Sequence, residues 1–515
     1  MRHTFVAPLA AAMALWTLAA AAQPAPPPPA PAPTEADEEP PLAGWHGVFF
    51  LRSKDDNFQL FPRARLHVDF HAFAGPGVHD VRAIDGGNAL KARLFARRLR
   101  FELAGNVFKR VDYLLGVDFG GQPIANANGK TQSSASNAGQ EPTDSSARFA
   151  AVQSVSAAAA IANTWINLSI VPELNLMVGQ EKAPFSLENR TGNNTHTWME
   201  RSLPIRSFVF PSSREIGLTV WGDLGKDKVL AYEVGVFGGD GQNRPQIDNR
   251  ADFLGRVYAR PLASVVKGPL AKAQIGLSAK RGDRDPDYVG YSYPGITSGQ
   301  GFTFWDPRYR DSAGRQTYVL PSGAQSAIGG ELRVPISRFD LIGEAYYVAN
   351  DTREAIDGYQ LTNTERLGSF TGVGWYAQLS AWVLGDAFVS GDPGVVRPTR
   401  LDFTKKPEVK KGLEVFGIVG GVHATYDGAS REGAYDSKTP GAAGVASNIE
   451  VLQYGLGASY WYTRALKASL NFIAYHVPGS GSADNLAVAP GNIAAEKDEE
   501  AHVLYEIGTR FHVAF

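Results

Sequence analysis

The last fourteen residues of the chain, 502–515, alternate in polarity from one residue to the next. One set of alternate positions is apolar, and the other set carries His502, Glu506, Arg510 and His512. Successive side chains of a β-strand point to opposite faces, so the segment predicts a strand with one apolar and one charged face. A soluble sheet could show this pattern. A strand that ends the chain on an aromatic residue, Phe515, is typical of a bacterial outer-membrane barrel, whose outer face meets lipid.

The N-terminus predicts export. A charged start, Met1 to His3, precedes an apolar run over 5–18 and four alanines at 19–22. This is the pattern of a secretory signal peptide, with cleavage expected after Ala22. The run is too short and too rich in alanine to favour a transmembrane helix, and no later segment has eighteen unbroken apolar residues. We therefore expect an exported protein, located in the bacterial outer membrane, that has no helical anchor.

Residues 23–56 predict a periplasmic linker and a short lead-in to the barrel, because the segment begins rich in proline and alanine and carries an acidic cluster. A ligand for a proline-recognition module is the alternative. The chain has no cysteine, so disulfides do not stabilise it, and its formal charge of −2 predicts no nucleic-acid partner. A length of 515 residues suggests two or three domains, but a large barrel is an exception, and we assign 57–515 to one barrel.

The first clear strand of this barrel covers 63–72. Its odd-numbered positions are polar: Arg63, Arg65, His67, Asp69 and His71. Its even-numbered positions are apolar: Ala64, Leu66, Val68, Phe70 and Ala72. A charged side chain facing the middle of the bilayer costs roughly 2–4 kcal/mol, so the polar set is expected to face the water of the lumen and the apolar set to face lipid. His67 and His71 lie about 13 Å apart along such a strand, so they cannot hold one metal ion by themselves.

The same reasoning predicts an all-β protein, a transmembrane antiparallel β-barrel of sixteen strands. The expected strands are 57–73, 92–104, 111–119, 161–170, 174–180, 214–223, 229–237, 253–260, 272–281, 325–334, 339–347, 372–385, 412–425, 448–463, 465–476 and 502–515. Long connections alternate with mostly short ones, as extracellular loops alternate with periplasmic turns. One turn, 386–411, is anomalously long, and its three prolines argue against a hidden strand. Residues 301–305 could form a further strand, but an odd count would break the alternation, so we assign them to a loop.

Another loop, 282–324, opens with three aspartates at alternate positions, Asp283, Asp285 and Asp287. Carboxylates at such spacing can bind calcium. A solvated acidic loop is the simpler interpretation, and the sequence leaves both open.

The third long loop, 181–213, differs from the others because it is rich in large apolar residues: Phe185, Trp198, Met199, Leu203, Ile205, Phe208, Val209 and Phe210. Such residues should be buried. Folding of the loop into the lumen would pack them on the barrel wall and leave the charged residues to line a narrowed pore. An oligomer contact or a surface lid is the alternative.

In this region the chain resembles the phosphate-selective porin O and P family. The resemblance rests on Val178-Gly179-Gln180, Lys182, Pro184-Phe185-Ser186, Glu188, Met199-Glu200-Arg201-Ser202-Leu203-Pro204, Arg214-Glu215-Ile216-Gly217, Asn249-Arg250, Asp252-Phe253 and Gly255-Arg256. It extends over roughly residues 45–515. It implies a trimeric porin of sixteen strands with an inward third loop and a ladder of basic side chains for anions. The phosphate-selective members cluster lysines at the constriction, whereas this loop has one, so phosphate specificity stays open.

Pairing of the last strand with the first predicts a basic side of the lumen. Lumen-facing positions on four neighbouring strands carry Lys467, Arg510, Arg63, Arg65, Arg98 and Arg100, offset by Glu506, Asp69 and Glu102. The distant wall carries Asp340, Glu344 and Glu414. The third loop is expected to bring its own cations towards the pore axis, opposite the basic side. The predicted anion-binding residues are Arg63, Arg65, Arg98, Arg100, Lys182, Arg201 and Arg206. Structural ion pairing is the alternative role for them.

The predicted function is therefore passive diffusion of small anions through a water-filled pore, with phosphate and polyphosphate among the candidates. The expected partners are anionic solutes, outer-membrane lipid, two further copies in a homotrimer, and the barrel-assembly machinery, which would read the strand that ends at Phe515. A non-selective or sugar-conducting porin is the first alternative. An enzyme or an adhesion barrel is less favoured, since the chain has no G-x-S-x-G or H-E-x-x-H motif. We expect no catalytic residues, no metal and no cofactor.

Overall fold

The computed structural model describes residues 41–74, 92–120, 160–208, 213–285, 288, 293–305, 308–310, 316–356, 366–403, 407–428, 446–478 and 503–515. Residues 1–40 lie outside this range, so the signal peptide and most of the linker stay predictions. Most of the expected loops at 74–91, 120–160, 426–447 and 477–501 also lie outside it.

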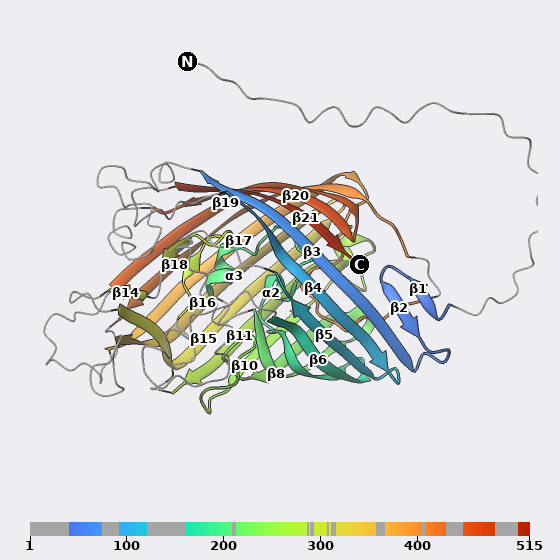
Figure 1. The fold of residues 1–515 in the computed structure, drawn as a ribbon, viewed down its shortest axis with the longest axis horizontal. Helices are drawn as coiled ribbons and strands as arrows, with labels where there is room; N and C mark the ends of the chain where they lie inside the picture. The colour runs from blue at the N-terminus through green and yellow to red at the C-terminus, as the bar shows by residue number, and fades with distance from the viewer. Residues whose placement is uncertain are drawn as a thin grey trace, which may run out of the picture. The chain divides into compact units, whose positions relative to one another are not determined.

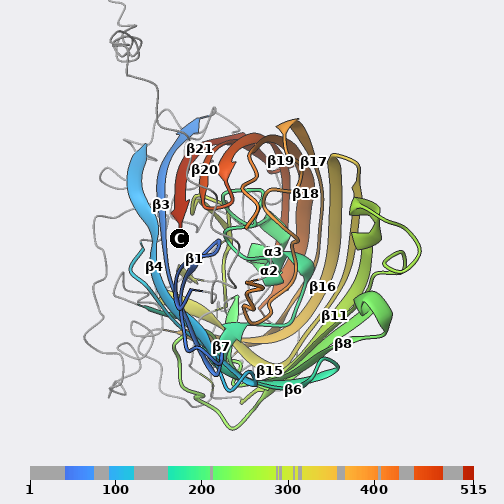
Figure 2. The same ribbon diagram turned by 90° about the vertical axis from the view of Figure 1, so that its right-hand side faces the viewer.

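Sixteen antiparallel strands form a closed barrel, as predicted (Figures 1 and 2). They are β3 (Phe58–Ala74), β4 (Arg93–Val107), β5 (Val111–Asp118), β6 (Ala160–Val171), β7 (Leu174–Lys182), β8 (Arg214–Leu224), β9 (Leu230–Phe237), β10 (Asp252–Ala259), β11 (Gln274–Arg284), β15 (Gln316–Ile336), β16 (Phe339–Ile356), β17 (Arg366–Gly385), β18 (Gly412–Asp427), β19 (Ala446–Thr463), β20 (Leu466–His476) and β21 (Val503–Ala514). Each strand pairs with the next along the chain, and β21 pairs with β3.

The closing seam extends to the last residue. His512 lies opposite His67, and Phe511 lies opposite Val68. The backbone N–H of Phe515 donates to the carbonyl of Ala64 at 3.0 Å, and the N–H of Ala64 donates back at 2.7 Å. The terminal residue therefore completes the ladder between the first and last barrel strands.

Three strands, β15 to β17, are much longer than the sequence predicts. β15 has 21 residues where ten were expected, and its pairing with β16 shifts register between Pro321 and Gln325. A membrane needs only about 9–11 residues of a tilted strand. The rest of such a strand has no lipid on its outer side. It therefore does not need to alternate apolar and polar residues, and this alternation was the signal that predicted the strands.

Additional short elements are not part of the barrel wall. β1 (Ala43–Trp45) and β2 (Phe49–Arg52) form a hairpin whose second strand pairs with the start of β3. β12 (Ile296–Thr297) and β13 (Thr303–Trp305) pair only with each other, and β14 (Arg308–Arg310) adds to β15, so residues 301–305 lie in a loop as predicted. The short helices are α2 (Leu187–Arg190), α3 (Leu203–Phe208), η3 (Lys226–Lys228) and η4 (Pro269–Lys272). Within the described ranges, no helix is long and apolar enough to cross a membrane.

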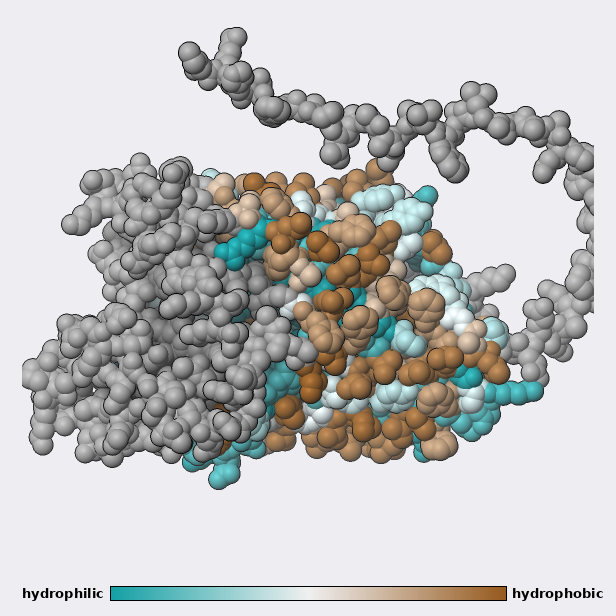
Figure 3. Space-filling view, in the orientation of Figure 1, coloured by the Kyte–Doolittle hydropathy of each residue, from teal (hydrophilic) through white to brown (hydrophobic). Residues whose placement is uncertain are grey.

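The outer surface of the strands is apolar (brown in Figure 3). Leu277 on β11 and Leu456 on β19 are 66% and 69% exposed, and Phe70 on β3 also points outward. A soluble protein of ordinary composition would bury such residues, whereas lipid favours them. The predicted outward face of β3 is confirmed.

The inward face of β3 is confirmed, but its predicted contact with lumen water is wrong for two residues. His67 and Asp69 are 0% and 1% exposed. Arg510 donates two hydrogen bonds to the carboxylate of Asp69, both at 2.7 Å, and the third loop lies over this part of the wall through Met199. The loop and the ion pairs replace the water.

A β-bulge changes the parity of β4. His67 pairs with Arg98 and Val68 pairs with Ala96, so Arg97 is the extra residue. A bulge places two consecutive side chains on one face. Arg97 and Arg98 both contact the third loop inside the barrel. Arg97 was not among the predicted lumen-facing residues, although the apolar set shifts there from even-numbered to odd-numbered positions.

Cysteine labelling tests the assignment of the faces. The chain has no native cysteine, so single substitutions report cleanly. Leu277→Cys and Leu456→Cys should react with a reagent confined to lipid, and Arg65→Cys should react only with a small water-soluble reagent. The cysteine-free wild type is the control. Reaction of position 456 with a bulky water-soluble reagent alone would show that the faces are inverted.

Candidate functional site

The third loop fills the centre of the barrel, where α2 and α3 lie inside the ring of strands (Figure 2). The apolar residues that predicted this position and that the structure describes are all buried: Phe185, Trp198, Met199, Leu203, Ile205 and Phe208. Val209 and Phe210 lie outside the described residues. The prediction of an inward third loop is confirmed.

Glycines on the wall make room for these side chains. A Cβ built at Gly374 on β17 would lie 2.7 Å from the ring of Phe208 and 2.9 Å from Pro204. A Cβ at Gly455 on β19 would lie 2.8 Å from the Trp198 ring. Real Cβ atoms do not approach this closely, so the wall positions under the loop require glycine. The glycine content of the inward face therefore helps to hold the loop in place.

The start of α2 is fixed by a carboxylate from the wall. Glu344 on β16 accepts hydrogen bonds from the backbone N–H groups of Leu187 and Glu188 at 2.9 and 2.7 Å and from the hydroxyl of Tyr376 at 2.6 Å. The first N–H groups of a helix have no partner within it, and a carboxylate satisfies them well. One of the three predicted acids of the distant wall thus positions the loop.

On the other side, Glu200 joins the loop to the arginines. Its carboxylate lies 3.0 Å from Arg97, 3.4 Å from Arg98 and 2.7 Å from Arg510. Burial raises the pKa of Glu200, but these three guanidinium groups lower it more, so its pKa lies well below the ordinary value. Glu200 is therefore ionised, and it neutralises part of the predicted ladder. This carboxylate was not among the offsetting acids that we predicted.

The basic side of the lumen exists as predicted, because β20, β21, β3 and β4 are neighbours. Its members differ in how strongly acids neutralise them. Arg100 bonds to Asp118 on β5 at 2.7 Å, a second carboxylate that we did not predict. Arg98 contacts Glu200 and the ring nitrogen of His67, so it is covered by the loop. For Arg98 and Arg100, ion pairing accounts for most of the local contacts.

A cavity of about 190 Å³ opens in front of the remaining cations. Arg63, Arg65, Arg100, Lys182 and Arg397 line it, and Glu102 is its one acidic lining residue. Within the described residues, Arg63 and Lys182 have no carboxylate at ion-pair distance, and Arg65 only approaches Glu102 at 3.7 Å. The Nε groups of Arg63 and Arg65 are buried without a hydrogen-bond partner. Basic side chains therefore outnumber acidic ones in the lining of this cavity.

The loop cations do not all lie where we predicted. Lys182 lies in the same cavity as Arg63 and Arg65, not opposite them, because β7 continues the wall that β3 and β4 begin. Its Nζ donates to the carbonyl of Thr191. The third loop leaves the wall only after this residue.

Arg201 and Arg206 bond mainly to backbone carbonyls. Arg201 donates to the carbonyl of Asn189 at 3.4 Å, and Arg206 donates to the carbonyls of Arg201 and Thr297. Neither lines the cavity. These contacts stabilise the fold of the loop, and any role in anion binding stays a prediction.

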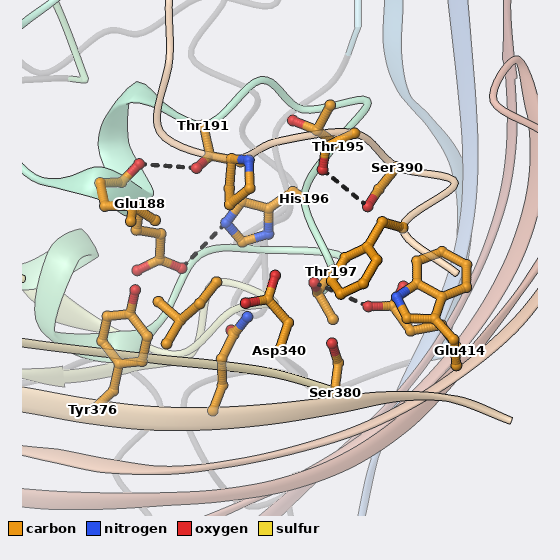
Figure 4. Close-up of a pocket in the computed structure, with 17 residues that line it drawn as sticks. Glu188, Thr191, Thr195, His196, Thr197, Asp340, Tyr376, Ser380, Ser390 and Glu414 are labelled. Atoms are coloured by element: carbon orange, nitrogen blue, oxygen red, sulfur yellow. Dashed lines mark hydrogen bonds and ion pairs between the residues drawn. The ribbon is translucent and has the colours of Figure 1, made fainter. Parts of the chain in front are cut away.

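Lys467 also departs from the predicted basic side. Its Nζ donates to the carbonyl of His196 at 3.0 Å and lies 4.2 Å from the centre of the Trp461 ring. It therefore points towards the acidic wall. There, a small pocket of about 30 Å³ is lined by Glu188, Asp340 and Glu414 together with hydroxyl and aromatic side chains (Figure 4).

The anomalous turn is a structural element that the sequence did not reveal. Residues 386–403, here called the strap, lie inside the barrel mouth, at the end that carries the short turns (orange in Figure 2). Arg397 bonds to Asp223 at 2.9 Å and to Glu233 at 2.6 Å, and Arg400 bonds to Asp112 at 2.9 Å. The strap thus starts between β17 and β18 and reaches β5, β8 and β9 across the lumen. The sequence did contain a signal for this element, because Arg397 and Arg400 lie within a turn that is unusually long.

The far end of the strap joins an apolar cluster. Leu401 and Phe403 of the strap, with Val48 beside the β1–β2 hairpin, pack on inward-facing residues at the turn end of the wall. The buried members are Phe50 of the hairpin and the wall residues Phe61, Ala104, Leu114, Trp165, Met177 and Trp221. Alternation alone predicts a polar lumen here. The hairpin and the strap bury these residues instead.

The possible calcium site gains no support. Arg250 bonds to Asp285 at 2.7 Å and lies 3.9 Å from Asp283. Asp287 lies outside the described residues. No group of three metal-binding side chains occurs in the part of the chain that the structure describes.

A closed sixteen-stranded barrel with an apolar outer face and a loop folded into a charged lumen defines an outer-membrane porin. The family described as phosphate-selective porin O and P matches residues 64–260, which hold β3 to β10, the third loop and most of the basic cavity. The resemblance seen in the sequence is therefore confirmed over this region. A comparison with curated proteins gave no match.

The solved structures that this chain matches include three bacterial proteins. OmpT of Vibrio cholerae is 8% identical, with 90% of this chain and 99% of that chain covered and a TM-score of 0.45. The channel DcaP of Acinetobacter baumannii is 12% identical, with 90% and 99% covered and a TM-score of 0.44. An anion-selective porin from Comamonas acidovorans is 11% identical, with 89% and 100% covered and a TM-score of 0.42. At these values the likeness says nothing about the solute.

Gly374→Val tests how the loop is docked. The new side chain would overlap Phe208 and Pro204, and overpacking of this kind costs about 1–3 kcal/mol. We expect α3 to leave the wall, so single-channel conductance in planar bilayers should change and fluctuate more. Gly417→Val is the matched control, because a Cβ there makes only ordinary contacts at 3.5 Å. Equal conductance in both variants would contradict the docking role.

Glu200→Gln tests the link between the loop and the arginines. Removal of one negative charge beside Arg97, Arg98 and Arg510 should shift the reversal potential in a KCl gradient towards anions. The depressed pKa keeps the ion pairs intact above about pH 4.3, the ordinary glutamate value, and they are lost only below it. The difference in reversal potential between the variant and the wild type should therefore be constant between about pH 5 and 8.

The matched control for this experiment is Glu408→Gln, because Glu408 is exposed in the turn after the strap. It should leave the reversal potential unchanged. A shift of the same size in both variants would mean that total charge, rather than the contact with the arginines, sets the selectivity.

Proposed function

We propose that this porin is an anion-selective channel and that the cavity lined by Arg63, Arg65, Arg100 and Lys182 is its anion-binding site. The observation that carries the proposal is the lining of this cavity, where five basic side chains and one carboxylate occur together. Acids outside the lining pair with Arg100 and Arg397, which leaves Arg63 and Arg65 as the least neutralised guanidinium groups. A confined, partly dehydrated channel strengthens such a field relative to an open surface. Small anions would therefore concentrate there and cations would be repelled.

The chemistry of the cations supports oxyanions. A guanidinium group presents its N–H donors in a planar fork that matches two oxygens of a carboxylate or a phosphate. Arg63 and Arg65 lie two residues apart on one face of β3, and their Nε groups have no protein partner. Arg98, Arg201 and Arg206 are already bonded within the fold, so we assign them a supporting role. A non-selective or sugar-conducting pore would not need free arginines at this place.

The cellular context of the proposal follows from the sequence. We infer that residues 1–22 are a signal peptide, that the short turns face the periplasm, and that three copies assemble in the outer membrane, as the family resemblance implies. Lipid would cover the apolar outer face. The strand that ends at Phe515 would be read by the assembly machinery, since this residue completes the closing seam.

Reversal potentials test the function directly. Across a tenfold KCl gradient, purified wild type should show anion preference. Arg63→Gln combined with Arg65→Gln should remove most of it, because the two least neutralised guanidinium groups are lost. Arg281→Gln, an exposed arginine that bonds to Ser326, is the matched control and should behave as wild type. Cation preference in the wild type would overturn the proposed function.

A further inference from the structure

The lining of the cavity contains apolar as well as charged side chains. The strap contributes Val395, Val396 and Pro398 to its lining, and the wall contributes Leu114 and Trp165. We propose that the cavity selects small organic carboxylates with an apolar body over inorganic oxyanions. This inference rests on the proposed anion-channel function and names the class of anion.

The strap holds Val395 and Val396 in a fixed position relative to Arg63 and Arg65. Arg397, between Val396 and Pro398, bonds to Asp223 and Glu233 and lies 4.2 Å from the centre of the Trp221 ring. On the other side, Gly394 donates its N–H to the hydroxyl of Thr191 at 2.9 Å. The valines between these two anchors therefore cannot turn away from the cavity without breaking them.

The basic residues of the cavity would bind the carboxylate group of the solute. Arg63 donates to the hydroxyl of Thr399 on the strap, so β3 and the strap are in direct contact beside the cavity. Arg63 and Arg65 line the cavity, and their buried Nε groups have no hydrogen-bond partner in the protein, so these guanidinium groups are less fully bonded than the others. Lys182 lines the same cavity, and its Nζ donates to the carbonyl of Thr191.

The shape of the cavity fits such a solute. One water molecule needs about 10–15 Å³ of comparable space, so about 190 Å³ admits a solute of several heavy atoms. Ligand sites commonly combine an apolar lining with a few placed polar groups. An inorganic phosphate would leave the valines and Leu114 against water, whereas a ring or short alkyl chain attached to a carboxylate would cover them. The geometry therefore favours an amphipathic anion.

Block of the chloride current measures this preference. Benzoate, acetate and phosphate should each be titrated against single channels of the purified full-length protein in planar bilayers. We expect benzoate to block at concentrations at least about tenfold lower than acetate, since both carry the carboxylate and only benzoate has an apolar body.

Substitutions in the strap locate the effect. Val395→Asn with Val396→Asn should weaken block by benzoate about tenfold more than it weakens block by acetate, because only benzoate has an apolar body to contact the valines. Val396→Thr, which keeps the shape of the side chain, is the second variant in case the double variant does not fold. Val409→Asn is the matched control, because Val409 is 79% exposed in the same turn.

The outcomes separate this inference from the proposed function. Equal block by benzoate and acetate in an anion-selective wild type would overturn the inference and leave the function standing. Benzoate block that is unchanged in the folded strap variants, or that is equally weakened by Val409→Asn, would also overturn it. A wild type that prefers cations would overturn the proposed function itself.

Discussion

In a bilayer no water is available to the backbone, so every N–H and C=O group of a spanning strand must bond to another strand. The pairing of β21 with β3 meets this requirement, because it leaves the sheet without an edge. Closure also has a consequence for the lumen. It makes β20 and β21 neighbours of β3 and β4, and so places Arg510 beside Asp69 and in reach of the same Glu200 that binds Arg97 and Arg98.

A closed barrel of this size would be wide, and inserted segments divide its interior. Among the described residues, the third loop and the strap are the inserted segments that border the basic cavity. The third loop is held by glycines under its aromatic residues, by Glu344 at the start of α2 and by Glu200 at the arginines. The strap enters from the end with the short turns and is held by Arg397 and Arg400. The basic cavity lies between these segments and the wall, so its composition depends on all three.

The number of carboxylate contacts distinguishes the arginines with a structural role from those that could bind a solute. Arg510 lies between Asp69 and Glu200, and Arg100 bonds to Asp118, so both are largely neutralised. Removal of one partner from such a buried pair is costly, which suits residues that fix the loop to the wall. Arg63 and Arg65 have fewer carboxylate contacts, and their buried Nε groups have no hydrogen-bond partner in the protein. The same residue type thus anchors the loop at one height of the lumen and is open to a solute at another.

The sequence by itself determined the strand count, the closing strand and the inward third loop, because lipid imposes alternation on each strand and large apolar residues in a loop require burial. It also placed Arg63, Arg65 and Arg100 on one wall. It missed the bulge at Arg97, where one extra residue reverses parity, and the extensions of β15 to β17, where lipid no longer imposes alternation. Only the tertiary structure showed that Glu200 and Asp118 neutralise some arginines and that the strap supplies Val395 and Val396 to the cavity. These contacts join residues far apart in the chain, and no local periodicity records which of them meet.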